Sequence, residues 1–284
     1  MIISASRRTD IPAFYSDWFL NRITDGYVKV KNPYNPNQIN CYKLDPDSVD
    51  GIVFWTKNPQ PILDKLTELK NYNYYFLFTL NAYNYAVEPN LPPKAELIDV
   101  FRKLSDLIGS GRVIWRYDPI LYSLTYNRNY HLKNFKEIAS QLQGYTHKCI
   151  ISFIDIYQKN KTALHQHGLY RPSEQEACDL LDQLWMIASN EGIFLQTCGE
   201  NLPSDNPHTK PGKCIDNNLL AYISGKKIVY RKDKSQRKNC LCQESIDIGS
   251  YNSCQHRCLY CYAKGNMKSA QEYYRNFSVD SESM

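Results

Sequence analysis

Residues 51–71 read GIVFWTKNPQPILDKLTELKN, and this stretch carries the pattern that decides the fold. Its first six residues, 51–56, are almost continuously apolar and rich in β-branched and aromatic side chains, which predicts a buried strand. A polar turn follows at 57–59, and the apolar spacing of 60–71 predicts an amphipathic helix. A buried strand, a polar loop and a helix together form one βα unit.

The same unit recurs along the first 200 residues, in kind rather than in sequence. Further strands are predicted at 2–6, 74–80, 112–117, 149–154 and 193–197, and further helices at 14–25, 93–108, 131–143 and 173–191. Apolar strands that alternate with helices favour parallel pairing through right-handed crossovers. Six such units predict an α/β fold. It is either a partial (βα)6 barrel, resembling an incomplete TIM barrel, or a doubly wound sheet.

Polar side chains follow the predicted strands at the points where they end. They include Arg8, Asp10, Lys57, Asn58, Arg116 and Asp118. Parallel barrels collect their catalytic groups at the carboxyl ends of the strands. An arginine or aspartate beside a buried strand also costs free energy unless it is paired. The pattern therefore predicts a binding site at this end of the sheet, and the alternative is a set of ordinary polar loops.

Length and composition limit the class of protein. The chain has 284 residues, 43% hydrophobic and 13% aromatic, which predicts one or two domains with a sizeable core. No apolar run approaches ~18 residues, so no membrane-spanning helix is expected. The N-terminal sequence MIISASRRTD has the wrong order for a secretory signal, and we therefore expect a cytoplasmic protein.

Positive charge is concentrated in one segment. The net charge is +5, and residues 226–238, KKIVYRKDKSQRK, hold seven cations and one anion. A basic stretch of this kind can bind nucleic acid or another polyanion. The alternative interpretation is a solvated stretch of surface.

Seven of the ten cysteines lie at or after residue 198. In a reducing cytoplasm, disulfides are rare, and dense cysteines are more often ligands of metals or clusters. The seven fall into two sets. The first set is Cys254, Cys258 and Cys261, and the second set is Cys198, Cys214, Cys240 and Cys242.

The first set has the spacing CxxxCxxC. A loop can wrap three such thiolates around a [4Fe–4S] cluster and leave one iron without a protein ligand. The alternatives are a zinc site, with His256 or another cysteine as the fourth ligand, and three reduced thiols.

The second set offers four thiolates, which suit a second [4Fe–4S] cluster or a zinc ion. Two other interpretations stay open. One of the four could complete the first cluster and close its open iron, which would make that cluster an electron carrier or a structural site. The four could also share no site.

The motif CQHRCLYC, with Tyr260 directly before its last cysteine, resembles the hallmark of the radical S-adenosylmethionine (SAM) superfamily. The resemblance implies a partial (βα)6 barrel, a [4Fe–4S] cluster, and SAM bound to the open iron. It also implies a reductant such as flavodoxin or ferredoxin, whose electron cleaves SAM to a 5′-deoxyadenosyl radical. That superfamily normally carries the motif after its first strand, whereas here the motif lies near the C-terminus. The usual GGE segment after the second strand is also replaced, by Lys57 and Asn58.

Four stretches extend the resemblance over nearly the whole chain: ISASRRTDIPAFY, IVFWTKNP, WRYDPI and DIGSYNSCQHRCLYCYA. They are similar to a bacterial family, domain of unknown function 1848, which pairs the N-terminal signature with a C-terminal CxxxCxxC motif. That family is in turn similar to radical SAM proteins. The resemblance implies a fold and a cofactor but no substrate.

The radical SAM resemblance implies roles for individual side chains. The candidates for binding SAM are Tyr260, Arg116, Arg8, Lys57, Asn58 and Asp118. Tyr260 would pack near the adenine, and the fork of Arg116 or Arg8 would suit the carboxylate. Asp118 could hold a ribose hydroxyl or the substrate. Each arginine could instead be a structural ion-pair partner, Arg116 with Asp118 and Arg8 with Asp10.

The expected organisation has three parts. Residues 1–200 form the partial barrel, residues 201–265 a loop-rich iron–sulfur extension, and residues 266–284 a tail with a helix and a disordered end. The leading hypothesis is an enzyme that cleaves SAM reductively and acts on an unknown substrate. One alternative is a nucleic-acid-modifying or repair enzyme with the same chemistry. The other is a non-enzymatic binding module that is stabilised by zinc or by an iron–sulfur cluster.

Overall fold

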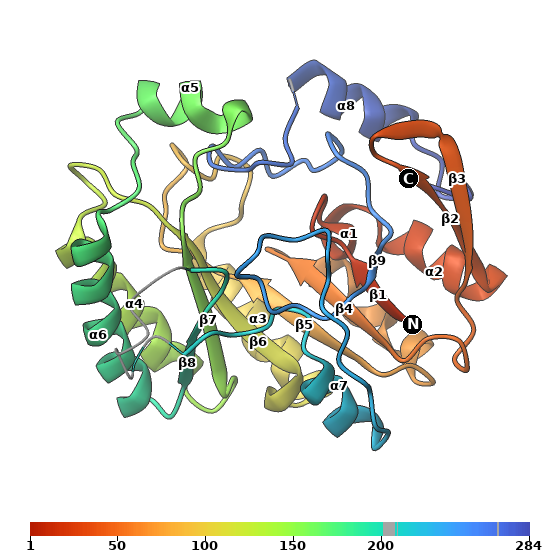
Figure 1. The fold of residues 1–284 in the computed structure, drawn as a ribbon, viewed down its shortest axis with the longest axis horizontal. Coiled ribbons are helices and arrows are strands. Elements are labelled where there is room, and N and C mark those ends of the chain that lie inside the picture. Colours follow the sequence, from red (N-terminus) through yellow and green to blue (C-terminus); the bar gives the residue numbers. More distant parts are fainter. Residues whose placement is uncertain (201–207, 209, 266) are drawn as a thin grey trace.

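The computed structural model describes residues 1–200, 208, 210–265 and 267–284. Its centre is a seven-stranded sheet in the order β8-β7-β6-β5-β4-β1-β9 (Figure 1), and all its pairs are parallel. The strands are β1 (Ile2–Ala5), β4 (Gly51–Thr56), β5 (Tyr74–Thr79), β6 (Val113–Ile120), β7 (Lys148–Phe153), β8 (Phe194–Thr197) and β9 (Ile246–Asp247). The first six coincide with the six predicted strands, and β9 was not predicted.

The strand order confirms the α/β class. From β1 to β8, each strand of the sheet pairs with the one before it in the chain, without the reversal that marks a doubly wound sheet. The sheet does not close into a barrel in the described part of the chain, because β8 and β9 form its two edges.

Helices cover one face of the sheet. They are α2 (Ser16–Asp25), η1 (Gln60–Leu69), α3 (Lys94–Ile108), α4 (Arg128–Leu142) and α6 (Glu174–Asn190). All five overlap predicted helices, although η1 winds as a 3₁₀ helix. Side chains that alternate along the strands, such as Ile52 and Phe54 of β4, form the main core with these helices.

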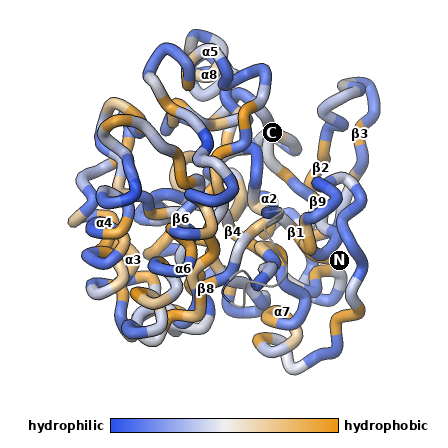
Figure 2. Tube along the Cα trace, turned by 60° about the vertical axis from the view of Figure 1, so that its left-hand side comes forward, coloured by the Kyte–Doolittle hydropathy of each residue, from blue (hydrophilic) through white to orange (hydrophobic). Residues whose placement is uncertain are grey.

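The opposite face of the sheet is buried too. Val53 of β4 points to this side and belongs to a second apolar cluster, which includes Leu220 of α7 (Asn217–Ser224). A Cβ atom added at Gly51 would lie 2.4 Å from the Leu220 side chain, so the close approach of α7 requires glycine there. Burial on both faces explains the continuous apolar runs of the strands. Figure 2 shows the hydrophobic colours gathered along the central strands.

Several elements lie outside the βα pattern. They are α1 (Ile11–Phe14), the antiparallel hairpin β2 (Tyr27–Asn32) and β3 (Asn35–Lys43), α5 (Gln158–Gln166), and α8 (Met267–Asn276). Only α8 falls where a helix was predicted. In Figure 1, α8 and the C-terminal residues lie beside the hairpin.

The end of the chain is packed, so the expected disorder there is wrong. The Trp18 indole donates a hydrogen bond to the Ser281 carbonyl at 2.7 Å, and the Lys29 N–H donates to the Glu282 carbonyl at 2.8 Å. Met284 is buried against the main core.

The segment 201–265 contains little regular structure where it is described. Its strand β9 pairs with β1, which joins this segment to the edge of the main sheet. The loop predicted at its start falls partly on residues 201–207 and 209, which lie outside the described residues. Among the helices that the structure describes, none has the length and apolar character needed to cross a membrane.

Candidate functional site

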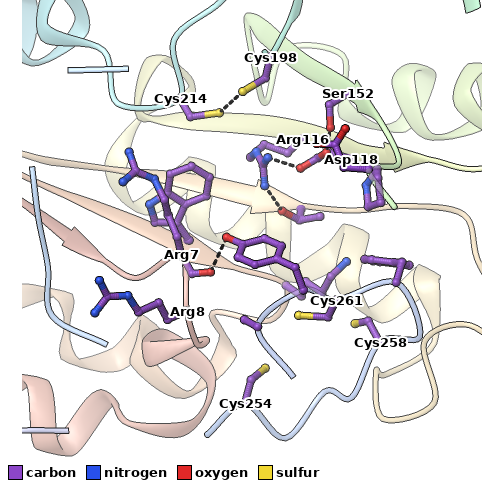
Figure 3. A pocket seen from close by; sticks show the side chains of 18 of the residues that line it. Arg7, Arg8, Arg116, Asp118, Ser152, Cys198, Cys214, Cys254, Cys258 and Cys261 are labelled. Atoms are coloured by element: carbon purple, nitrogen blue, oxygen red, sulfur yellow. Dashed lines mark hydrogen bonds and ion pairs between the residues drawn. The ribbon is translucent and has the colours of Figure 1, made fainter. Parts of the chain in front are cut away.

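A cavity of about 260 Å³ opens at the carboxyl ends of the parallel strands. Its walls include residues that end or follow β1, β4, β5, β6, β7 and β8, which confirms the strand ends as the place where polar groups gather. All seven cysteines of the two sets also line it. Figure 3 shows Cys198 and Cys214 on one side and Cys254, Cys258 and Cys261 on the other, with Arg7 and Arg116 between them.

Asp10 helps to hold the C-terminal motif at the end of the sheet. Its Oδ2 accepts a hydrogen bond from the Lys57 backbone N–H at 2.7 Å and lies 2.8 Å from Nε2 of His256. Nearby, the Tyr15 hydroxyl donates to the Ser253 carbonyl at 2.7 Å. The motif is therefore tied to the ends of β1 and β4, although it lies at the other end of the chain.

The three thiols of the first set are close enough to interact electrostatically with one another. Burial raises the pKa of the Cys258 thiol to about 12, although Lys57 acts in the opposite direction. Burial also raises the pKa of Cys254 and Cys261, while the His256 backbone N–H hydrogen-bonds to the Cys254 sulfur. Three adjacent buried thiols ionise together only when positive charge is supplied, as a metal centre does.

His256 is the candidate fourth ligand for zinc, and its Nε2 interacts with Asp10. Its Nδ1 is buried and has no hydrogen-bond partner in the described part of the chain. The ring packs on Phe14, with centroids 4.6 Å apart.

Tyr260 belongs to a buried network that the sequence did not indicate. Its hydroxyl hydrogen-bonds to Glu88, and Asn81 donates to the same hydroxyl at 3.2 Å. Glu88 also pairs with Lys57, at 2.7 Å, and with Lys94. Burial alone would raise the pKa of Glu88, but the two lysines outweigh it and lower that pKa to about 2. Glu88 is thus a buried, ionised carboxylate that interacts electrostatically with Cys258; a lone glutamate in a loop has no motif to mark it.

The candidate SAM residues after β4 occupy different places. Lys57 lines the cavity, and its ammonium lies 5.4 Å from the centroid of the Tyr260 ring. Asn58 is not among the residues that line the cavity. Its side-chain oxygen instead accepts a hydrogen bond from the Gln60 N–H at 3.2 Å, because η1 begins there.

Arg116 and Asp118 both line the cavity and form an ion pair with each other. Arg116 also donates to Thr79 at 3.2 Å and lies over the Trp55 ring, and its Nε is buried without a partner in the described chain. Asp118 accepts a further hydrogen bond from Ser152. Arg116 interacts electrostatically with the second thiol set, so it lies on that side of the cavity.

Arg8 lines the cavity near β9. It donates to the Gly249 carbonyl at 3.3 Å, and its guanidinium stacks over Tyr251 at 5.3 Å. Its nearest carboxylate is Asp247, at 3.9 Å, rather than Asp10. Asp247 in turn accepts hydrogen bonds from Ser4 at 3.0 Å, from Ser6 at 2.5 Å and from the Arg7 N–H at 2.8 Å, which fixes the loop after β1.

The second thiol set is more deeply buried than the first. Hydrogen bonds link Cys214 with Cys198 and with Cys242, and Cys240 with Cys242. Among the residues that the structure describes, no three or more His, Cys, Asp or Glu side chains are grouped as they would be around a bound metal ion. The thiols thus interact with one another in their metal-free form.

The basic segment 226–238 forms part of the cavity wall. Gln236 and Arg237 line the cavity, and Arg237 pairs with Asp155. Asp233, the single anion of the segment, pairs with Arg7 at 3.2 Å. All seven cations of the segment remain exposed.

The family model described as Domain of unknown function (DUF1848) matches residues 2–263. The chain belongs to this family. The match spans both the strand-end residues and the cysteine motif, so the cavity is built from the DUF1848 region except for Lys264. A comparison with curated proteins finds no match.

Proposed function

We propose that this DUF1848 protein is a radical SAM-type enzyme whose [4Fe–4S] cluster is held by Cys254, Cys258 and Cys261. The observation that carries the proposal is the position of these three thiols beside one cavity at the carboxyl ends of the strands. An open parallel sheet with sequential strand order also suits a partial (βα)6 barrel, and the carboxyl ends of its strands are where such a fold binds substrate.

The donor set fits the cluster. Three adjacent cysteines supply three of the four ligands of a [4Fe–4S] centre and leave one iron open. Nε2 of His256 faces Asp10, so only Nδ1 of this histidine could act as a ligand. When bound, the cluster would supply the electron that cleaves SAM.

The residues of the chain would orient SAM and exclude water. Tyr260 would fix the cysteine loop through Glu88, and Lys57 would remain charged beside it. Arg8 lies outside the Arg116–Asp118 ion pair and is the better candidate for the SAM carboxylate. Asp118, already paired with Arg116, would hold a hydroxyl of the ribose or of the substrate.

Reductive cleavage of SAM tests this function. The anaerobically reconstituted protein, given dithionite and SAM, should release 5′-deoxyadenosine and methionine. Cys258→Ala should abolish both products, whereas the matched buried variant Cys149→Ala should retain them. A reconstituted wild-type protein that binds iron but produces neither would contradict the proposal.

The exposed cations of 226–238 favour one more specific candidate, in which the substrate is a nucleic acid. A protein that neutralises phosphates releases counterions, so its affinity falls steeply as salt increases. Fluorescence anisotropy with a labelled oligonucleotide should therefore show this dependence, and Lys226→Ala together with Lys227→Ala should reduce its slope. If the affinity for the oligonucleotide is absent or does not depend on salt, the substrate is not a nucleic acid, and a small molecule or a peptide takes its place.

A further inference from the structure

We propose that Cys198, Cys214, Cys240 and Cys242 bind one thiophilic divalent ion, zinc in the first instance, at a closed site separate from the first set of cysteines. The proposal does not rest on the radical SAM activity. It rests on the contacts among four thiols from three segments, on the face of the sheet that α7 covers.

Hydrogen bonds connect the four sulfurs in series, from Cys198 through Cys214 and Cys242 to Cys240. The Sγ atoms of Cys198 and Cys214 lie 3.3 Å apart, and Cys242 is hydrogen-bonded to both Cys214 and Cys240. Cys240 also interacts electrostatically with Cys198.

The spacing favours a single ion over a cluster. Four sulfurs at ~2.3 Å from a tetrahedral zinc ion lie ~3.8 Å from one another, and the sulfurs of one pair, Cys198 and Cys214, lie 3.3 Å apart. The cysteine sulfurs around a [4Fe–4S] cluster must lie farther apart, because four irons and four sulfides separate them. Binding zinc would exchange the hydrogen bonds between thiols for four Zn–S bonds and release the thiol protons to water.

The surroundings are those of a structural site. All four cysteines are buried, and they share an apolar cluster with α7 and with Val53 and Ile114 of the sheet. The Ile215 N–H donates to the Cys242 sulfur at 3.5 Å. This kind of outer hydrogen bond orients a metal-bound thiolate.

Two arginines, whose side chains are 12% exposed, would balance the negative charge that four thiolates around one divalent ion carry. Both line the same cavity as the four cysteines; Arg7 interacts electrostatically with Cys242, and Arg116 with Cys198 and Cys214. Nη2 of Arg7 and Nε of Arg116 are buried without a hydrogen-bond partner in the described residues. Unused cationic donors at this place fit an anionic metal centre.

Metal analysis of a variant without the first set separates this proposal from the radical SAM proposal. The triple variant Cys254→Ala, Cys258→Ala, Cys261→Ala should contain about one zinc per chain and no iron or sulfide. Adding Cys214→Ala or Cys242→Ala should remove the zinc, whereas adding the matched buried change Cys149→Ala should not. Iron with sulfide in the triple variant would overturn the single ion, and zinc that survives Cys214→Ala would overturn the site.

The unaltered chain provides a second measurement if the variants fail to fold. Protein produced with cobalt in place of zinc should show the visible bands of tetrahedral thiolate-bound Co²⁺, with about one cobalt per chain. Protein that takes up no cobalt, or whose cobalt spectrum is octahedral, would contradict the proposal.

Discussion

Glu88 is fully buried, with Lys57, Lys94 and Tyr260 around it. The carboxylate connects the end of β4 to the loop that carries the cysteine motif. Sequence spacing predicted the three cysteines and Tyr260, because their chemistry is local. It could not indicate Glu88, whose partners come from three separate parts of the chain.

Replacing Glu88 should destabilise the protein strongly. Glu88→Gln leaves two partly buried lysines without a counter-charge, and breaking a buried ion pair in this way costs about 3 kcal/mol. Denaturant unfolding should therefore give a lower free energy of unfolding than for wild type. The control Glu137→Gln, on an exposed helix face, should change little. Equal effects of the two variants would show that the network contributes no stability.

The low pKa of the Glu88 carboxylate predicts that the stability of the fold depends on pH. The lysines lower the pKa of Glu88 to about 2, against about 4.3 in an unfolded chain. A lowered pKa stabilises the fold above the unfolded value, and this stabilisation is lost as the pH falls towards 2. The difference in stability between wild type and Glu88→Gln should thus shrink from pH 5 to pH 2.5. A difference that stays constant over this range would contradict the assigned ionisation.

At the scale of elements, the periodicity of apolar residues predicted those strands and helices that bury apolar side chains. The strands β1 and β4 to β8 and the helices on the outer face follow from apolar runs and helical spacing. The hairpin β2–β3 was missed although residues 28–31 of β2 alternate between apolar and polar; its second strand, β3, is polar and mostly exposed and lacks that alternation. The two-residue strand β9 exists only through its pairing with β1, which no local pattern can encode.

The packing of α7 on the sheet provides a test at this scale. Gly51→Ala would place a methyl group against Leu220, and such overpacking costs about 1–3 kcal/mol. Leu220→Ala in the same chain should recover part of this loss, because the two changes act at one contact. Gly111→Ala is the control, since nothing lies within 4 Å of a Cβ there. Additive effects of Gly51→Ala and Leu220→Ala would contradict the close approach of α7.

At the scale of the whole molecule, the chain brings its two ends to one cavity. The N-terminal loop after β1 and the motif at 254–261 are joined through Asp10, and the second thiol set gathers across the opposite wall. The sequence predicted both sets of cysteines, but not which sulfurs meet, because their contacts span up to 28 positions along the chain, from Cys214 to Cys242. The roles of Arg7 and Asp247 likewise depend on tertiary contacts.

The most direct test of the central claim is the EPR spectrum of the anaerobically reconstituted, reduced protein, recorded with and without SAM. An open iron on Cys254, Cys258 and Cys261 predicts a reduced-cluster signal that shifts when SAM is added and is lost in Cys258→Ala. A cluster signal that is indifferent to SAM would contradict the account and indicate a closed electron-transfer or structural centre.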